Sequence, residues 1–279
     1  MRAFSLALLP LALAAAAAAA PRDSGAPSAA DLSYADLADL ALAAPVAAHV
    51  RVAEAIAVKD GLASGLRPGF ARVYVQADVV ALVRAPATIP GRVSYVVDLP
   101  RDPKGKPPKL RKGSEFLLLA APVAGRPGEL RLVAPDAQLP FSPASAQRLR
   151  AILREASAPA PPPRIAGVGK AFHVPGSLPG ESETQIFLQT ADQRPVSLTI
   201  LRRPGQTPQW AVALGEVVDE AAAAPAPESL LWYRLACGLP PRLPAQSLSE
   251  AEAGTAGAIQ ADYRLVLERL GPCIRNRPR

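Results

Sequence analysis

Apolar and polar residues alternate with a period of two through several segments of the first half of the chain. The clearest is FARVYVQADVVALVR, residues 70–84, where alanine and valine occupy every second position from Ala71 to Val83. This pattern is typical of a β-strand that buries one face and exposes the other. Four further segments have strand character: residues 46–58, 92–99, 115–123 and 129–134.

Five strands with this spacing predict a small barrel or a strongly curled sheet. Their size and number resemble an oligonucleotide/oligosaccharide-binding (OB) barrel, although a lysine-rich loop replaces the helix that usually separates the third and fourth strands. Helices are predicted on both sides of this β unit. Ser33 and Asp36 form a capping pattern for a helix that ends at Pro45, and Ser142 followed by Pro143 begins another.

A proline-rich stretch, residues 158–163, predicts a stiff linker and a domain boundary. Beyond it, four strand signals joined by short turns predict an antiparallel meander: residues 165–174, 183–191, 195–203 and 208–219. Two helices follow. One runs through Leu230–Leu235, and the other begins near Ser249, with Glu252 completing a capping box, and ends at Gly271.

The predicted fold class is therefore α+β and β-dominated. It contains a five-stranded OB-like barrel and a four-stranded meander, each followed by a helix, and a C-terminal helix pair. Of the 279 residues, 49% are hydrophobic, which is enough for a core in each unit. The predicted organisation is a signal peptide over residues 1–20, a first unit over 31–157, the linker over 158–163 and a second unit over 164–279.

The N-terminal stretch predicts export. Arg2 precedes an apolar segment from Phe4 to Ala14, and an alanine run then offers several small-residue cleavage sites. This order is typical of a secretory signal peptide, so we expect a periplasmic or secreted protein with no transmembrane span after cleavage. Pro10 and the weak membrane insertion of alanine disfavour an uncleaved anchor.

The cysteine content agrees with an oxidising compartment. Cys237 and Cys273 are the only two cysteines, and an even count in an exported chain predicts a disulfide between them. Both lie at the C-terminal ends of predicted helices, which the disulfide would tie together. With only two histidines, the chain lacks the ligands for multi-histidine metal sites, zinc fingers or iron–sulfur clusters, so we expect no metal and no cofactor.

Positive charge is concentrated in one loop. The formal net charge is +7, and four of the six lysines fall within residues 101–113, RDPKGKPPKLRKG. The candidate binding residues are Lys104, Lys106, Lys109, Arg111 and Lys112. Such a run is either a solvated hairpin loop or a binding site for an anionic partner, which would be an envelope protein or an anionic envelope surface. We expect no nucleic-acid partner, because an exported protein does not routinely meet nucleic acid.

One region could support catalysis. Residues 172–185, FHVPGSLPGESETQ, place a histidine near serines and carboxylates between two predicted strands. The candidate catalytic residues are His173, Ser177, Glu181 and Glu183, with Ser182 beside them. Histidine beside hydroxyl and carboxylate groups can act in acid–base or nucleophilic catalysis, but the prolines and glycines also explain the segment as a turn-rich loop. No nucleophile-elbow, phosphate-loop or zinc-protease motif supports an enzyme.

Four stretches carry a resemblance to a known family: VAPDAQLPFSP, AFHVPGSLPGESETQIFLQTADQRPVSL, LRRPGQTPQWAVALGEVVDEAA and LLWYRLACGLP. They resemble uncharacterised exported proteins of sphingomonad-type alphaproteobacteria. The resemblance spans the mature chain and implies export and a shared fold. That family has no assigned activity, so the resemblance assigns no functional residue.

We therefore expect a non-enzymatic binding or scaffolding module that contacts a cell-envelope component or protein. The alternative is a hydrolase of an envelope polymer, with its site in the loop from His173 to Glu183. The hydrolase requires His173 within hydrogen-bond reach of Ser177, Ser182 or a carboxylate. The binding module requires an exposed basic or apolar patch.

Overall fold

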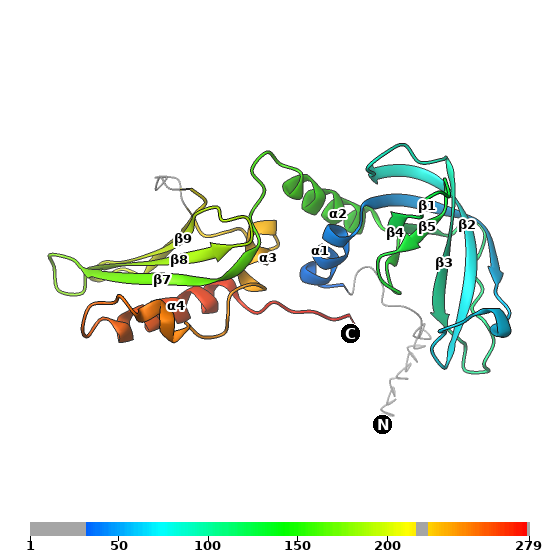
Figure 1. Cartoon of the computed structure of the whole chain (residues 1–279). Coiled ribbons are helices and arrows are strands. Elements are labelled where there is room, and N and C mark those ends of the chain that lie inside the picture. Colours follow the sequence, from blue (N-terminus) through cyan, green and yellow to red (C-terminus); the bar gives the residue numbers. More distant parts are fainter. Residues whose placement is uncertain (1–31, 216–222, 278–279) are drawn as a thin grey trace, which may run out of the picture.

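The computed structural model describes residues 32–215 and 223–277 and contains two β units joined by helices (Figure 1). In Figure 1 the barrel lies on the right, the open four-stranded sheet lies on the left, and α1, α2 and α3 lie between them. The predicted α+β, β-dominated fold class is confirmed. The predicted signal peptide, residues 1–20, lies outside the described residues.

The first unit is a nearly closed sheet with the strand order β3-β2-β1-β4-β5, and β6 pairs with β4. Its strands are β1 (Val46–Ala57), β2 (Phe70–Arg84), β3 (Arg92–Pro100), β4 (Glu115–Pro122), β5 (Leu130–Leu132) and β6 (Gln138–Pro140). A parallel bridge between Ser94 and Glu129 brings the β5 end of the sheet to β3. The circular order β1-β2-β3-β5-β4 is that of an OB-like barrel, as predicted.

Two helices cover the outer face of β1 and β4. They are α1 (Tyr34–Ala43) and α2 (Pro143–Ala156), and their apolar residues pack against Leu117 and Leu119 of β4. The Ser33 side chain accepts a hydrogen bond from the first turn of α1, as its capping pattern predicts. Because both faces of β4 are buried, its sequence is a continuous leucine run instead of an alternation.

The second unit is a four-stranded antiparallel meander with the order β10-β9-β8-β7, which confirms the predicted topology. Its strands are β7 (Ile165–Pro175), β8 (Ser182–Thr190), β9 (Val196–Arg202) and β10 (Gln209–Ala213). Residues 216–219 of the last predicted strand segment lie outside the described residues. Two short 3-10 helices, η1 (Asp60–Leu62) and η2 (Ala245–Leu248), complete the elements together with α3 (Leu230–Ala236) and α4 (Ala256–Leu270).

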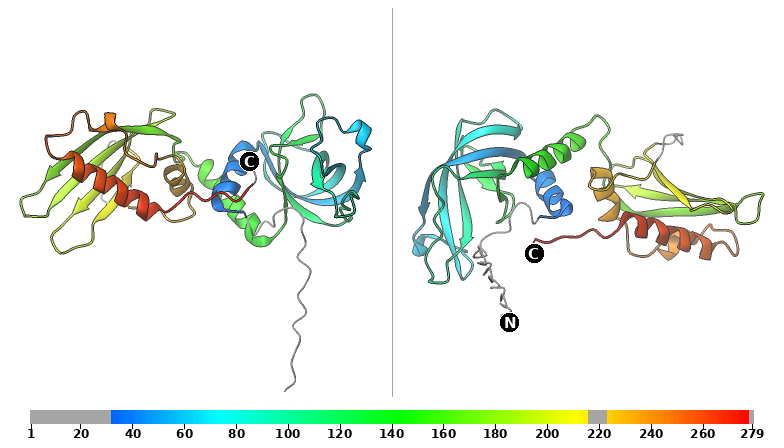
Figure 2. Two further views of the ribbon diagram at one scale, coloured as in Figure 1. Left: turned by 90° about the horizontal axis from the view of Figure 1, so that it is seen from below. Right: turned by 180° about the vertical axis from the view of Figure 1, so that it is seen from behind.

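Helix α4 covers one face of the meander, as the views in Figure 2 show. It begins at Ala256, so the capping box predicted at Ser249 and Glu252 is wrong. The physical reason is Gly254, whose φ of 87° is a left-handed conformation that a right-handed helix cannot include. From Thr255 onward the apolar stripe of α4 packs against the sheet as the sequence predicts.

The C-terminal tail, residues 271–277, ties the two units together, and we call it the C-terminal strap (Figure 1). Arg275 Nε donates to Asp39 Oδ2 of α1 over 2.7 Å, and Arg277 Nη2 lies 2.6 Å from Asp136 Oδ1 of the barrel. The disulfide attaches the strap to the end of α3. Since both carboxylates belong to the first unit and both arginines to the second, the strap is an ionic clasp between them.

Acid is expected to weaken this clasp. Burial alone would raise the pKa of Asp39 and of Asp136, but hydrogen bonds from Arg275 and Arg277 hold both pKa values below the ordinary value. A carboxyl group whose folded-state pKa is depressed contributes stability above its unfolded pKa of about 3.9 and loses that contribution as the pH falls through the folded-state pKa.

We therefore expect the stability difference between the wild type and an Arg275→Gln/Arg277→Gln variant to be constant from neutral pH to about pH 4 and to shrink below it. Urea denaturation at a series of pH values measures this difference. Equal acid sensitivity of the two proteins would contradict the assigned role of the strap.

Candidate functional site

The basic loop, residues 101–113, crosses one end of the barrel. It connects β3 to β4, which are not neighbours, because β3 pairs with β2 and β4 pairs with β1. The hairpin interpretation of this loop is therefore wrong. Asp102 shapes the loop, since its Oδ1 accepts hydrogen bonds from the backbone N–H groups of Lys104 and Lys106 at 2.9 and 2.7 Å. Arg101 is anchored to Asp60 through an ion pair of 2.6 Å.

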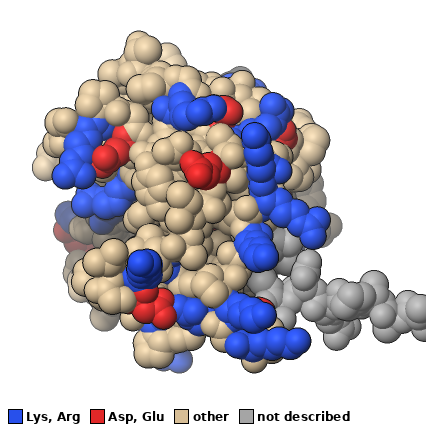
Figure 3. All heavy atoms as spheres, turned by 90° about the vertical axis from the view of Figure 1, so that its right-hand side faces the viewer, with Lys and Arg blue, Asp and Glu red and all other residues tan. Residues whose placement is uncertain are grey.

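Every candidate binding residue of the basic loop is exposed: Lys104, Lys106, Lys109, Arg111 and Lys112. Among the described residues, none of these five cations is within ion-pair distance of a carboxylate. The only carboxylate of the loop, Asp102, is committed to backbone hydrogen bonds. Figure 3 shows the outer side of the barrel, where Lys and Arg form several groups around the face and Asp or Glu adjoins some of these groups. The loop therefore presents uncompensated positive charge.

The candidate catalytic residues do not come together. His173 pairs with Thr184 across β7 and β8, and its side chain lies on the face that α4 covers. Glu183 pairs with Val174 one position further along, so its side chain points to the opposite face. Ser177 is exposed in the turn and makes no side-chain hydrogen bond to His173.

Glu181 makes contacts within its own turn. Its carboxylate accepts a hydrogen bond from the backbone N–H of Leu178 at 3.3 Å, and its side chain packs over Gly176. A Cβ at Gly176 would lie 2.4 Å from Glu181 Cγ, so only glycine fits there. The segment is thus the ordered turn of a hairpin, and the geometry that the hydrolase requires among these residues is absent from the described structure.

The structure reveals a buried polar network around Asp262 that the sequence analysis missed. Asp262 is 0% exposed, and Arg202 donates to its Oδ1 through Nε at 2.7 Å. The Thr184 hydroxyl donates to Asp262 Oδ2 at 2.5 Å. Because the hydroxyl proton is directed to Asp262, the Nδ1–H of His173 donates to Thr184 Oγ1 at 2.7 Å. His173 is therefore the end of a structural chain of hydrogen bonds.

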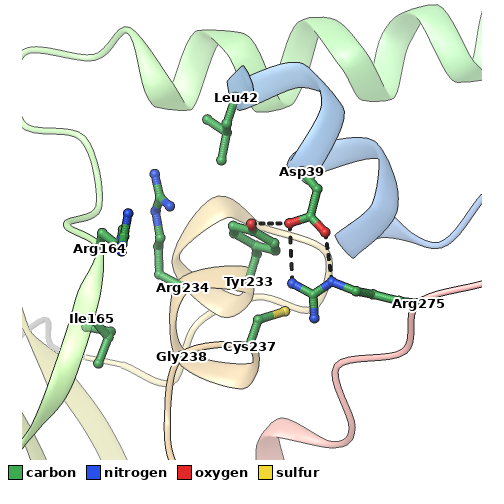
Figure 4. A pocket seen from close by; sticks show the side chains of 9 residues that line it. All are labelled: Asp39, Leu42, Arg164, Ile165, Tyr233, Arg234, Cys237, Gly238 and Arg275. Atoms are coloured by element: carbon green, nitrogen blue, oxygen red, sulfur yellow. Dashed lines mark hydrogen bonds and ion pairs between the residues drawn. The ribbon is translucent and has the colours of Figure 1, made fainter. Parts of the chain in front are cut away.

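A pocket of about 320 Å³ lies between the two units (Figure 4). Asp39 and Leu42 of α1 line one side, Arg164 and Ile165 at the start of β7 line another, and α3 contributes its C-terminal end. In Figure 4 Tyr233 and Arg275 both point toward the Asp39 carboxylate. These residues are far apart in the chain and share no motif, so their proximity is not predictable from the sequence.

The disulfide predicted from the sequence is present between Cys237 and Cys273. Cys237 is the C-cap residue of α3. Cys273 lies two positions after Gly271, the C-cap residue of α4. The expectation that the two cysteines join the ends of two helices is confirmed. The bond also attaches the C-terminal strap to α3.

Across residues 32–215 and 223–277, no helix is both long and apolar enough to cross a bilayer. The same part of the chain contains no group of three or more His, Cys, Asp or Glu residues arranged to hold a metal ion. Searches against protein-family models and against curated proteins find no match to this chain. Function must therefore be inferred from the surfaces and pockets themselves.

Proposed function

We propose that this protein is an exported, non-enzymatic binding module that docks the basic end of its barrel on an anionic membrane surface of the cell envelope. The observation that carries the proposal is the set of exposed cations in the basic loop, none of which pairs with a carboxylate in the described part of the chain. Export is supported by the signal-peptide pattern of residues 1–20 and by the disulfide, which is typical of oxidising compartments.

The loop suits a flat anionic surface. Its charges lie on one connection at one end of a rigid barrel, so several of them can approach a membrane together. Each Lys or Arg near an anionic leaflet contributes about 1 kcal/mol, and this contribution falls off within the Debye length. A cluster of four lysines is therefore sufficient for reversible, salt-sensitive attachment without a membrane-spanning segment.

We expect replacement of Lys104, Lys106, Lys109 and Lys112 by glutamine to weaken binding to phosphatidylglycerol vesicles by about a hundredfold or more, since about 1 kcal/mol is lost per charge. Vesicle co-sedimentation of the mature protein measures this change. Wild-type binding should also decrease steeply with added salt.

A matched variant distinguishes the contribution of the basic loop from that of the protein's net charge. Arg150, Arg154, Arg203 and Arg269 are exposed and form no ion pair among the described residues, so their replacement by glutamine removes the same charge elsewhere. This control should retain most of the binding. Equal loss in both variants, or no sedimentation of the wild type, would contradict docking through the loop.

A further inference from the structure

The pocket between the two units contains more positive charge than its carboxylate can balance. Three arginines line it, and they belong to the residue before β7, to α3 and to the C-terminal strap. One carboxylate, Asp39, accompanies them. In Figure 4 the side chains of Arg164 and Arg234 lie on the side of the pocket away from Asp39. Which of the three arginines is neutralised therefore depends on which of them the Asp39 carboxylate contacts.

Asp39 is already engaged. Its Oδ2 accepts from Arg275 Nε at 2.7 Å, and its Oδ1 accepts from the Tyr233 hydroxyl at 2.5 Å. Burial, with a further contribution from Asp39, raises the pKa of Tyr233 to about 12, so this hydroxyl remains a donor at neutral pH. Asp39 thus neutralises Arg275 and leaves the other two arginines uncompensated.

Arg164 and Arg234 have no carboxylate partner among the described residues. Arg164 is exposed at the rim, whereas the Nε atom of Arg234 is buried without any hydrogen-bond acceptor. The guanidinium carbon of Arg234 lies 5.6 Å from the centre of the Tyr233 ring, which holds the group beside the pocket. Burial lowers the pKa of Arg234, and the positive charge of Arg164 lowers it further. An anion between the two guanidinium groups would accept hydrogen bonds from their terminal N–H groups and would offset the repulsion between their positive charges.

We propose that this pocket binds the phosphate group of a ligand between Arg164 and Arg234. The two unpaired positive charges match a phosphate monoester dianion in charge. Guanidinium groups that approach from β7 and from α3 can each engage different oxygens of a tetrahedral anion, whereas a planar carboxylate offers only two oxygens. The site is separate from the basic loop, which lies at the barrel, so it is independent of the membrane-docking proposal.

Isothermal titration calorimetry of the full mature protein with inorganic phosphate tests the site, with acetate as the monoanionic comparison. We expect saturable binding of phosphate and much weaker binding of acetate. Arg164→Gln should weaken phosphate binding by about tenfold, as for the loss of one charge-assisted hydrogen-bonding group. Because Arg164 is exposed, this variant should fold normally, and Arg234→Gln, whose fold is checked by circular dichroism, should weaken binding at least as much.

The control is Arg203→Gln, which removes an exposed arginine of the same unit that has no ion pair to any described residue, and which should leave phosphate binding unchanged. Absence of saturable phosphate binding, or equal affinity in the Arg164→Gln variant and the wild type, would overturn the proposal. Two competition experiments then identify the source of the phosphate group. Glycerol 3-phosphate should displace inorganic phosphate if the ligand is a soluble monoester, and phosphatidic acid vesicles should displace it if the ligand is a lipid headgroup.

Discussion

Replacing Asp262 by alanine is expected to destabilise the second unit by about 2–3 kcal/mol, because it removes the acceptor of the buried Thr184 hydroxyl and of the partly exposed Arg202 guanidinium. Asp262 is 0% exposed and binds the Arg202 guanidinium through both Nε and Nη2, at 2.7 and 2.6 Å to Oδ1. It also accepts the hydroxyl proton of Thr184, which is itself fully buried. Without the carboxylate, a guanidinium group and a buried hydroxyl group would lose their partner together.

Urea denaturation followed by tryptophan fluorescence measures this loss, since Trp210 and Trp232 both pack against the core of the second unit. Glu268→Ala provides a matched control, because Glu268 is an exposed acidic residue of the same helix and forms no ion pair within residues 32–215 and 223–277. This substitution should change stability by less than about 0.5 kcal/mol. Asp262→Asn keeps an oxygen acceptor and should cost less than the alanine variant. Equal denaturation midpoints for Asp262→Ala and Glu268→Ala would contradict the assigned role of the network.

The position of Asp262 in the sequence indicates that it is buried. Asp262 follows Ile259 by three positions and precedes Val266 by four, so it lies on the apolar stripe of α4. A charged residue on a stripe that faces a sheet must find a buried partner or disrupt the packing. The partner itself was not predictable, because Arg202 ends a strand 60 residues earlier and no local pattern connects the two.

Local periodicity explains most of the fold that was predicted correctly. In β2 the alternation from Ala71 to Val83 is strong enough to give the strand its observed bounds, and Ser33 and Ser142 identify the helix starts through their caps. β6 was missed, because a strand of three residues is too short to show a period. The closure of the barrel through Ser94 and Glu129 was not visible either, since a single bridge leaves no repeat in the sequence.

The candidate sites show the same difference between features set by local sequence and features set by tertiary contacts. The basic loop was found because its charges are consecutive in sequence, and the disulfide was found because only one pairing of two cysteines exists. The pocket with Arg164 and Arg234 depends on tertiary contacts between α1, β7, α3 and the strap. A single arginine in each of two apolar segments does not predict such a pocket. His173 was selected for its neighbours in sequence, but alternation along β7 and β8 separates it from Glu183.

Removing the disulfide is expected to cost about 4 kcal/mol. The bonded cysteines are 36 residues apart, and the loss follows from the loop-closure entropy that the bond removes from the unfolded chain. Cys273 also lies within the C-terminal strap, and Arg275 Nη1 donates to its Sγ at 2.8 Å. Reduction should therefore loosen the attachment of Arg275 and Arg277 to the first unit in addition to destabilising the second.

A Cys237→Ser/Cys273→Ser variant and a reductant separate these effects. The wild type in reductant and the double variant should share a lowered urea midpoint by tryptophan fluorescence, and the double variant should not respond further to reductant. Hydrogen exchange should show loss of protection in α3 and α4, while the cysteine-free barrel core around Val75 keeps its protection. An unchanged midpoint after both thiols have been alkylated would show that the bond does not hold this unit. Loss of protection in the barrel to the same extent would instead show that the two units unfold as one cooperative body.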